Sequence, residues 1–223
     1  MRTNYVQELE SVRQNLVQMG ETTIALLTEA LSAVADPRPD PSARASELEA
    51  RTDHQHRFIH DRCLNLITLQ APVASDARLV TGVLDAIVDL ELFGDYAYEI
   101  VTLSSGMHGR PPAQVLGQIV ALGAKVQECL SAAVDSWRSL DRAQGLSVRP
   151  RAVLIRVECG ALYQKLAQLT SVSRDTTTYV DLMQICRHLE RILRHAANVG
   201  DQAADAAPSV QDDNKAQTPL AHR

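Results

Sequence analysis

The side chains whose types and spacing best suit ligand binding or catalysis are carboxylates at helical spacing. Glu91, Asp95 and Glu99 follow one another at intervals of four residues, and at ~100° per residue they share one face of a helix. Like charges in this register repel one another, so solvent, a basic neighbour or a cation must offset them. Glu49 and Asp53 form a matching pair earlier in the chain. If the two helices pack antiparallel, these carboxylates meet as a hard-oxygen site that suits iron, manganese or magnesium.

The same spacing also has a simpler interpretation. Acidic residues four apart are common on solvated helix faces, and Asp85 and Asp89 form a further pair of this kind. His56 and His60 share a face and are possible metal ligands, although a solvated polar face accounts for them as well. His195 is expected to be a hydrogen-bonded histidine at a helix interface. Spacing alone leaves both the metal site and the solvated face open.

Motifs for covalent or nucleotide chemistry are absent from the sequence. It contains no GxSxG, GxxxxGK[ST] or GxGxxG segment, and its single histidines do not form a triad with a nucleophile. Cys63, Cys129, Cys159 and Cys186 lie far apart and form no CxxC pair, which predicts buried, reduced thiols in a reducing compartment. We therefore expect a protein that is not an enzyme.

Charge and hydropathy narrow the class of partner. The 223-residue chain carries a net charge of −5 with histidine neutral, which argues against broad nucleic-acid binding and against a polybasic membrane patch. No stretch approaches the ~18 uninterrupted apolar residues of a membrane span. The first ten residues, MRTNYVQELE, contain no apolar signal core, so we expect a cytoplasmic protein.

Helical periodicity runs through nearly the whole chain. Apolar residues recur at spacings of three and four, as in Leu182, Ile185 and Leu189, and no alternating strand pattern competes with it. Prolines at 36–41 and 72, and glycines and prolines at 106–112, predict breaks. A further loop is expected around Gly145. The sequence predicts an all-α protein with six long antiparallel helices: one from near the start to the prolines at 36–41, then about 42–70, 73–105, 111–141, 149–170 and 175–205.

The break at 106–112 divides the six helices three and three. The segment Glu91–Ile100 also echoes Glu190–Val199, with the Glu, the Ala six residues later and the β-branched residue nine later aligned without gaps. An internal repeat explains both observations. We predict two tandem three-helix bundles over residues 1–106 and 107–205. A disordered tail over 206–223 is expected to follow, because its composition turns polar without periodicity.

Three segments resemble motifs of the PhoU family. Leu69–Arg78 (LQAPVASDAR) is similar to the LQxPVAxDLR turn between the second and third helices of that family. Asp89–Ala97 (DLELFGDYA) looks like its DLERIGDHA motif, and Leu189–Asn198 (LERILRHAAN) is similar to the same motif in the second repeat. The resemblance in order, spacing and six-helix layout extends over about residues 4–205.

The resemblance implies a cytoplasmic negative regulator of phosphate uptake and phosphate-responsive signalling, built from two similar three-helix bundles. The expected partners are the ATPase subunit of the phosphate ABC transporter and a membrane sensor histidine kinase, and a homodimer is expected. Two other hypotheses remain open. One is a metal store or carboxylate-bridged metalloenzyme built on the acidic pairs, and the other is an interaction module outside phosphate control.

The resemblance also implies where metal would bind. Some members of the family carry metal clusters on paired acidic motifs, one cluster in each repeat. By position, these motifs are Glu49/Asp53 and Glu91/Asp95 in the first repeat, and Glu99 stands where the family motif has Asn. The metal expected on these five residues is iron, manganese, zinc or magnesium.

The second repeat departs from the acidic pattern. Arg194 stands where the family motif has Asp, and Arg156 occupies the corresponding acidic position of the preceding helix. A guanidinium is permanently charged and cannot ligate a cation. We therefore predict at most one metal site, in the first repeat, and expect Arg194 to pair with Glu190 on its own helix.

Overall fold

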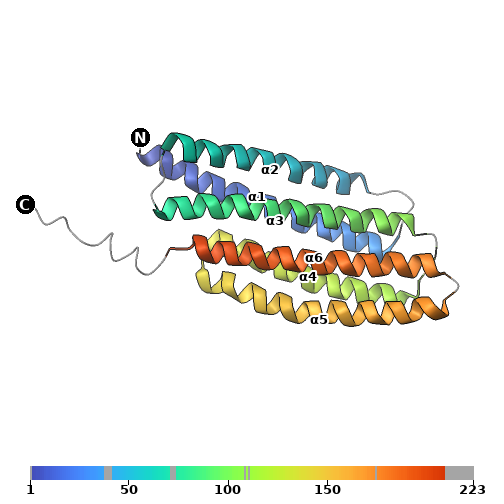
Figure 1. Cartoon of the computed structure of the whole chain (residues 1–223). Helices are drawn as coiled ribbons and strands as arrows, with labels where there is room; N and C mark the ends of the chain where they lie inside the picture. Colours follow the sequence, from blue (N-terminus) through green and yellow to red (C-terminus); the bar gives the residue numbers. More distant parts are fainter. Residues whose placement is uncertain are drawn as a thin grey trace, which may run out of the picture.

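Six α-helices account for nearly all of the chain that the computed structural model describes, namely residues 2–37, 42–70, 74–107, 109, 111–173 and 175–208. The turn predicted at Pro72 and the part of the predicted tail beyond residue 208 lie outside the described residues. The predicted start of the tail at residue 206 was wrong, because Ala206 is the last residue of a helix and both Ala206 and Ala207 are buried. This described part contains no strand, and none of its helices is long and apolar enough to cross a membrane. The helices run side by side (Figure 1) as α1 (Arg2–Ala35), α2 (Ala43–Gln70), α3 (Ala74–Gly106), α4 (Ala113–Ser139), α5 (Arg142–Val172) and α6 (Thr176–Ala206).

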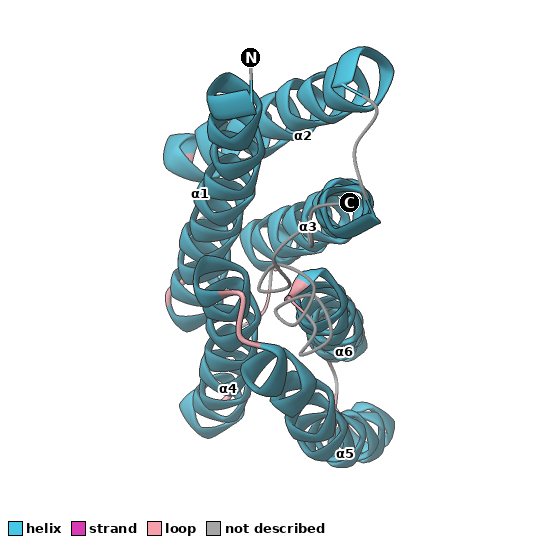
Figure 2. Cartoon of the chain, turned by 90° about the vertical axis from the view of Figure 1, so that its left-hand side faces the viewer, coloured by secondary structure: helices cyan, strands magenta, loops and turns pink. Residues whose placement is uncertain are grey.

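Helices α1–α3 form one three-helix unit and α4–α6 form a second. Within each unit every helix packs against the other two. The units meet where α3 packs on α6 and α1 packs on α4. Four helices therefore make the centre of the molecule, while α2 and α5 lie at its opposite ends (Figure 2). The predicted fold class, all-α with two tandem three-helix bundles, is confirmed.

One hydrophobic core runs through both units. The apolar stripe predicted for α6 is buried, and Leu182, Ile185 and Leu189 have no exposed surface. Burying an aliphatic side chain of this size contributes roughly 1.5–3 kcal/mol, so the stripe is the main reason why α6 stays in the bundle. Trp137 of α4 closes the core near the end of the second unit, where its Nε1 donates a hydrogen bond to the carbonyl oxygen of Val199 (3.0 Å).

A polar cluster is buried between α3 and α6. Asp89 accepts hydrogen bonds from His195 Nδ1 (2.6 Å), Asn198 Nδ2 (3.1 Å) and Gln202 Nε2 (2.8 Å). Asp89 and His195 are only 8% and 6% exposed. A buried polar group that loses its partner is costly, so this cluster selects one register of α3 against α6. The expectation of a hydrogen-bonded interface histidine at His195 is confirmed.

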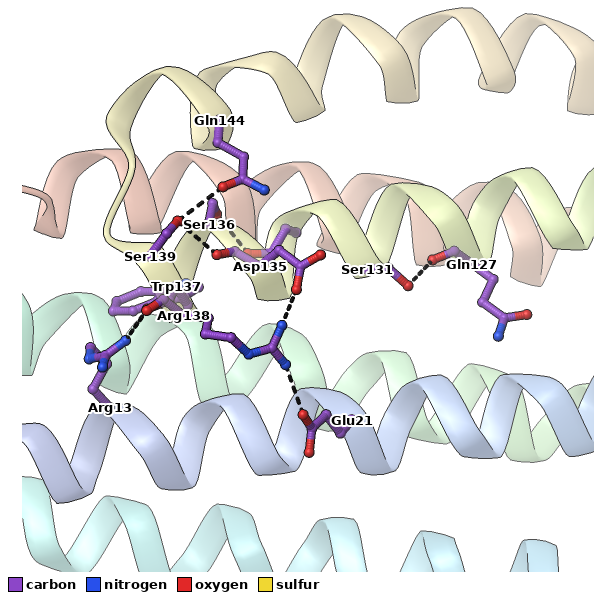
Figure 3. Close-up of polar contacts among 11 residues, drawn as sticks. Arg13, Glu21, Gln127, Ser131, Asp135, Ser136, Trp137, Arg138, Ser139 and Gln144 are labelled. Atoms are coloured by element: carbon purple, nitrogen blue, oxygen red, sulfur yellow. Dashed lines mark hydrogen bonds and ion pairs between the residues drawn. The ribbon is translucent and has the colours of Figure 1, made fainter.

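A second polar contact ties α1 to the end of α4 (Figure 3). Arg13 Nη1 donates to the carbonyl oxygens of Trp137 (2.7 Å) and Arg138 (2.5 Å). The last turn of a helix leaves such carbonyls without an intrahelical partner, and a cation there also complements the helix dipole. Arg138 in turn donates to Glu21 of α1 (2.8 Å) and pairs with Asp135 of its own helix.

Helix α5 begins at Arg142, seven residues earlier than predicted, and the loop predicted around Gly145 was wrong. Asp141 caps the helix, because its side chain accepts hydrogen bonds from the backbone N–H groups two and three residues later (2.8 and 3.1 Å). Gly145 lies where α5 and α6 nearly touch. A Cβ added to it would lie 2.5 Å from the carbonyl oxygen of Gly200. The glycine permits close packing and does not break the helix.

Replacing Gly145 and Gly160 by alanine should change stability in opposite directions. Gly145→Ala places its methyl group against the backbone of α6, which cannot move aside without separating the helices, so we expect a loss of about 1–3 kcal/mol in the free energy of unfolding. Gly160 lies on the same helix with open space around an added Cβ, and Gly160→Ala should gain about 0.5–1 kcal/mol. Urea denaturation followed by circular dichroism measures both. Equal stability of the two variants would contradict the close contact.

Candidate functional site

The predicted carboxylates flank a close contact between α2 and α3. A Cβ added to Gly94 of α3 would lie 3.2 Å from Cγ2 of the buried Thr52 of α2. The glycine therefore lets the two helices approach at this level. Asp53 and Asp95 directly follow these two residues in the chain, so both carboxylates emerge beside the contact.

Carboxylates from the two helices influence one another across this contact. The pKa of Glu49 is raised, first by burial and then by the negative charges of Asp53 and Asp95. The pKa of Asp95 is also raised by burial, and further by the charges of Glu91, Asp53 and Glu99. Mutual effects of this kind require short separations between like charges. The structure thus brings the pair from α2 and the row from α3 into one acidic cluster.

Two carboxylates of this cluster lie beside histidines. Glu91 Oε1 is 3.3 Å from His56 Nδ1 of α2. Glu99 Oε2 is 3.1 Å from His188 Nδ1 of α6, without the geometry of a hydrogen bond. Burial lowers the pKa of His188, and the charge of Glu99 opposes that effect. A lowered pKa leaves His188 uncharged at neutral pH, so it does not compensate the charge of Glu99.

The cluster fits a hard cation in the chemistry of its donors, since carboxylate oxygens are the ligands that such ions prefer. In the described part of the chain, however, no three His, Cys, Asp or Glu side chains stand close enough together to hold a metal ion. Closing on a cation would require the carboxylates to rotate toward one another. The site is therefore an acidic cluster with the right donors in an open arrangement.

The other histidine and acidic candidates have separate neighbours. His60 is exposed beside Asp61, with 3.5 Å between His60 Nδ1 and Asp61 Oδ1, and its ring centre lies 6.3 Å from that of His56, as expected for two residues on one face. Asp85 is exposed as expected of a solvated face. Asp89, which the spacing groups with Asp85, is instead buried against α6. No local pattern distinguishes the two aspartates, because only the packing of the second unit buries one of them.

The second repeat carries an arginine cluster at the equivalent place between α5 and α6. Arg156 and Arg194, which replace the expected carboxylates, line one pocket of 270 Å³ together with Arg187, Glu190 and Arg191. The predicted pairing of Arg194 with Glu190 was wrong. Glu190 accepts a hydrogen bond from Arg187 (3.0 Å), one turn earlier in α6, because stacking on the ring of Tyr163 holds the Arg187 guanidinium in reach. The sign of the charge is thus reversed between the two repeats.

The four cysteines are buried and free, as predicted. Burial raises the pKa of Cys63, Cys159 and Cys186 to about 12 and that of Cys129 to about 11. At neutral pH these groups are thiols, whereas nucleophilic attack and metal ligation require the thiolate. They act as small apolar side chains of the core.

Solved structures with the same arrangement of helices define the class of the chain as a two-repeat helical bundle of the PhoU type. The crystal structure of PhoU from Pseudomonas aeruginosa superposes with a TM-score of 0.82 at 24% identity, covering 89% of this chain and 96% of that one. The phosphate transport system regulatory protein PhoU from Streptococcus pneumoniae superposes with a TM-score of 0.81 at 20% identity, covering 91% and 96%. At these identities the likeness establishes the fold.

Sequence comparison then establishes the family. The PhoU domain model matches residues 16–103 and again 119–203. A protein of Synechocystis described as a phosphate-specific transport system accessory protein PhoU homolog is 27% identical over 203 residues, which cover 91% of each chain. The chain belongs to the PhoU domain family.

Neutralising Asp95 should stabilise the metal-free protein at neutral pH. Its pKa is raised on folding from 3.8, so the folded chain binds the proton more tightly than the unfolded chain. The ionised Asp95 side chain therefore destabilises the folded chain at pH values above its folded pKa. This destabilisation is lost as the pH falls below the unfolded pKa of 3.8. We expect Asp95→Asn to increase the free energy of unfolding by about 0.5–1 kcal/mol at pH 7, a small gain because Asp95 is exposed, from relief of its desolvation and of several like-charge contacts. No such effect is expected at about pH 2.5, below the unfolded pKa.

Chelator-treated protein unfolded by urea at both pH values measures this difference. Asp61→Asn is the matched control, since Asp61 carries the same charge on the exposed face of α2 outside the cluster. Loss of stability in Asp95→Asn at pH 7 would contradict the repulsion.

Proposed function

We propose that the chain is a cytoplasmic negative regulator of phosphate uptake and phosphate-responsive signalling that acts by docking and not by catalysis. Its expected partners are the ATPase subunit of the phosphate ABC transporter and a membrane sensor histidine kinase. Membership of the PhoU domain family supports the proposal, as does the name of the Synechocystis relative, which describes a phosphate-transport accessory protein. The burial of all four thiols is in keeping with a role without covalent chemistry.

The observation that carries the docking proposal is the apolar surface of α5. Leu154 and Val157 are each 69% exposed, and Leu146 and Val153 are about half exposed on the same helix. Helix α5 lies at one end of the molecule, and its main contacts among the described residues are with α4 and α6. Single exposed aliphatic residues need no explanation, but several along one outer helix are typical of a surface that another protein covers.

Charged residues on this surface should prevent docking without unfolding the chain. We expect a tagged full-length Leu154→Asp/Val157→Asp variant, expressed in phosphate-replete cells of the source organism, to recover at least tenfold less transporter ATPase subunit than the unmodified chain. Quantitative mass spectrometry of the purified complexes measures the recovery. Phosphate uptake in cells lacking the chromosomal copy should stay high with the variant and fall with the unmodified chain.

Val6→Asp/Val180→Asp is the matched control for this experiment. It adds the same two charges at exposed aliphatic residues of α1 and α6, which are 58% and 41% exposed. Equal recovery of the ATPase subunit with both double variants would exclude α5 as the docking surface. No recovery with the unmodified chain would overturn the proposed partner. The homodimer stays a prediction, which light scattering of the purified chain tests.

We also propose a single metal site on the acidic cluster of the first repeat, a second function that the mutual effects on the pKa values of Glu49 and Asp95 favour. Glu49, Asp53, Glu91, Asp95 and Glu99 would hold iron, manganese, zinc or magnesium. A bound cation neutralises the charges that raise these pKa values, and it would brace α2 against α3. The arginines at the equivalent place in the second repeat support a limit of one site per chain.

Removing two of these carboxylates should abolish metal binding. We expect elemental analysis of the purified chain to find no more than one site's worth of metal, and Glu91→Ala/Asp95→Ala to lose it, because each helix must supply ligands. Asp61→Ala/Asp85→Ala removes two exposed carboxylates from the same two helices and should retain the metal. Two equivalent sites per chain, or equal metal content in both variants, would overturn the proposal.

A further inference from the structure

The pocket between α5 and α6 is lined almost entirely by guanidinium groups. Arg156 comes from α5, and Arg187, Arg191 and Arg194 come from successive turns of α6. Glu190 is the one acidic residue in the lining. Four positive charges less one negative charge leave the pocket at +3, in a chain whose net charge is −5. This concentration of positive charge is not a consequence of composition.

Two of the arginines are held in place by aromatic rings. The Arg187 guanidinium lies 4.4 Å from the ring centre of Tyr163 and donates a hydrogen bond to Glu190 (3.0 Å). The Arg191 guanidinium lies 5.3 Å from the ring centre of Tyr96 of α3. Stacking of this kind restricts the side chain and leaves the edge of the guanidinium free to donate. The pocket therefore has partly fixed walls.

The other two arginines have no counter-charge of their own. No hydrogen bond or ion pair joins Arg156 or Arg194 to another residue in the described part of the chain. Both also line a smaller adjoining hollow with Arg149, whose own charge is met by Asp201 at 2.5 Å. Like charges one turn apart on a helix are destabilising. Both arginines thus line a shared space without a partner, and Arg194 does so one turn after Arg191 of the same helix, which is the destabilising register.

We propose that this pocket binds a small phosphoryl oxyanion, such as inorganic phosphate or diphosphate. The planar guanidinium fork matches the oxygens of a phosphate with paired hydrogen bonds. The pocket volume of 270 Å³ is several times the ~30 Å³ of a water molecule in the liquid, which leaves room for one or two phosphoryl groups. A net charge of +3 favours the more highly charged diphosphate over the sulfate dianion and over singly charged carboxylates.

The anion site lies at the place where the first repeat has carboxylates and the second repeat has arginines. Its existence does not depend on the docking proposal. A chain that fails to bind the transporter can still bind phosphate in this pocket. A chain that fails to bind phosphate can still bind the transporter. The phosphoryl group could be free or carried by a nucleotide. The chemistry of recognition is the same for both sources, so the experiment includes a probe for each.

Isothermal titration calorimetry of the purified full-length chain tests the proposal, with phosphate, diphosphate, ATP and sulfate as probes at constant ionic strength. We expect saturable binding, with diphosphate tighter than either phosphate or sulfate. Arg156→Gln/Arg194→Gln should weaken diphosphate binding about 100-fold, since it removes two charge-assisted donors. Its unliganded melting temperature should not fall, because both side chains are exposed and without partners.

Arg44→Gln/Arg151→Gln is the matched control. It removes two exposed arginines that pair with Glu29 and Glu128 outside the pocket, so the change in net charge is the same and binding should be unchanged. Equal weakening in both double variants would show diffuse attraction and overturn the site. Equal affinity for sulfate and diphosphate would overturn the assignment to phosphoryl groups, as would no binding of any phosphoryl probe. Binding of ATP but not of diphosphate would support the site with a nucleotide as the source.

Discussion

The contact between α3 and α6 is the constraint on which the rest of the molecule depends. Each of these helices is the third of its repeat, and each carries its repeat's chemical motif on a face beside this contact. The hydrogen bonds from His195, Asn198 and Gln202 to the buried Asp89 allow one register between the two helices. That register also places Tyr96 of α3 between the rings of His188 and His195, at centroid distances of 5.6 and 5.7 Å.

Because the centre is rigid, the outer helices α2 and α5 can carry side chains of different charge. In the described part of the chain, α2 packs mainly on α1 and α3, and α5 packs mainly on α4 and α6. The α2–α3 and α5–α6 boundaries therefore open to solvent at equivalent places at opposite ends of the molecule. Side chains there can change sign without disturbing the core, because water solvates whichever charge is present. One boundary has become acidic around Asp95 and the other basic around Arg194.

The helices and the acidic cluster could be predicted from the sequence because both depend on local periodicity. A spacing of three and four identifies the buried stripe of α6, and a spacing of four places Glu91 and Asp95 on one face. Features that depend on contacts between distant segments could not be predicted. Gly145 has the local signature of a loop, but the carbonyl of Gly200 on another helix explains why glycine is required. Asp89 has the spacing of a solvated residue, and only α6 buries it.

The reversal of charge between the repeats has a physical consequence for how the chain responds to its surroundings. A cation between α2 and α3 would relieve repulsion in the first repeat, and an anion between α5 and α6 would relieve it in the second. Either ligand stabilises the boundary that it occupies in proportion to its concentration relative to its dissociation constant. Both boundaries adjoin the same α3–α6 contact, through Glu99 beside His188 and Arg191 over Tyr96. A duplicated fold with opposite charges at its two equivalent boundaries thus offers two ligands of opposite sign access to one shared interface.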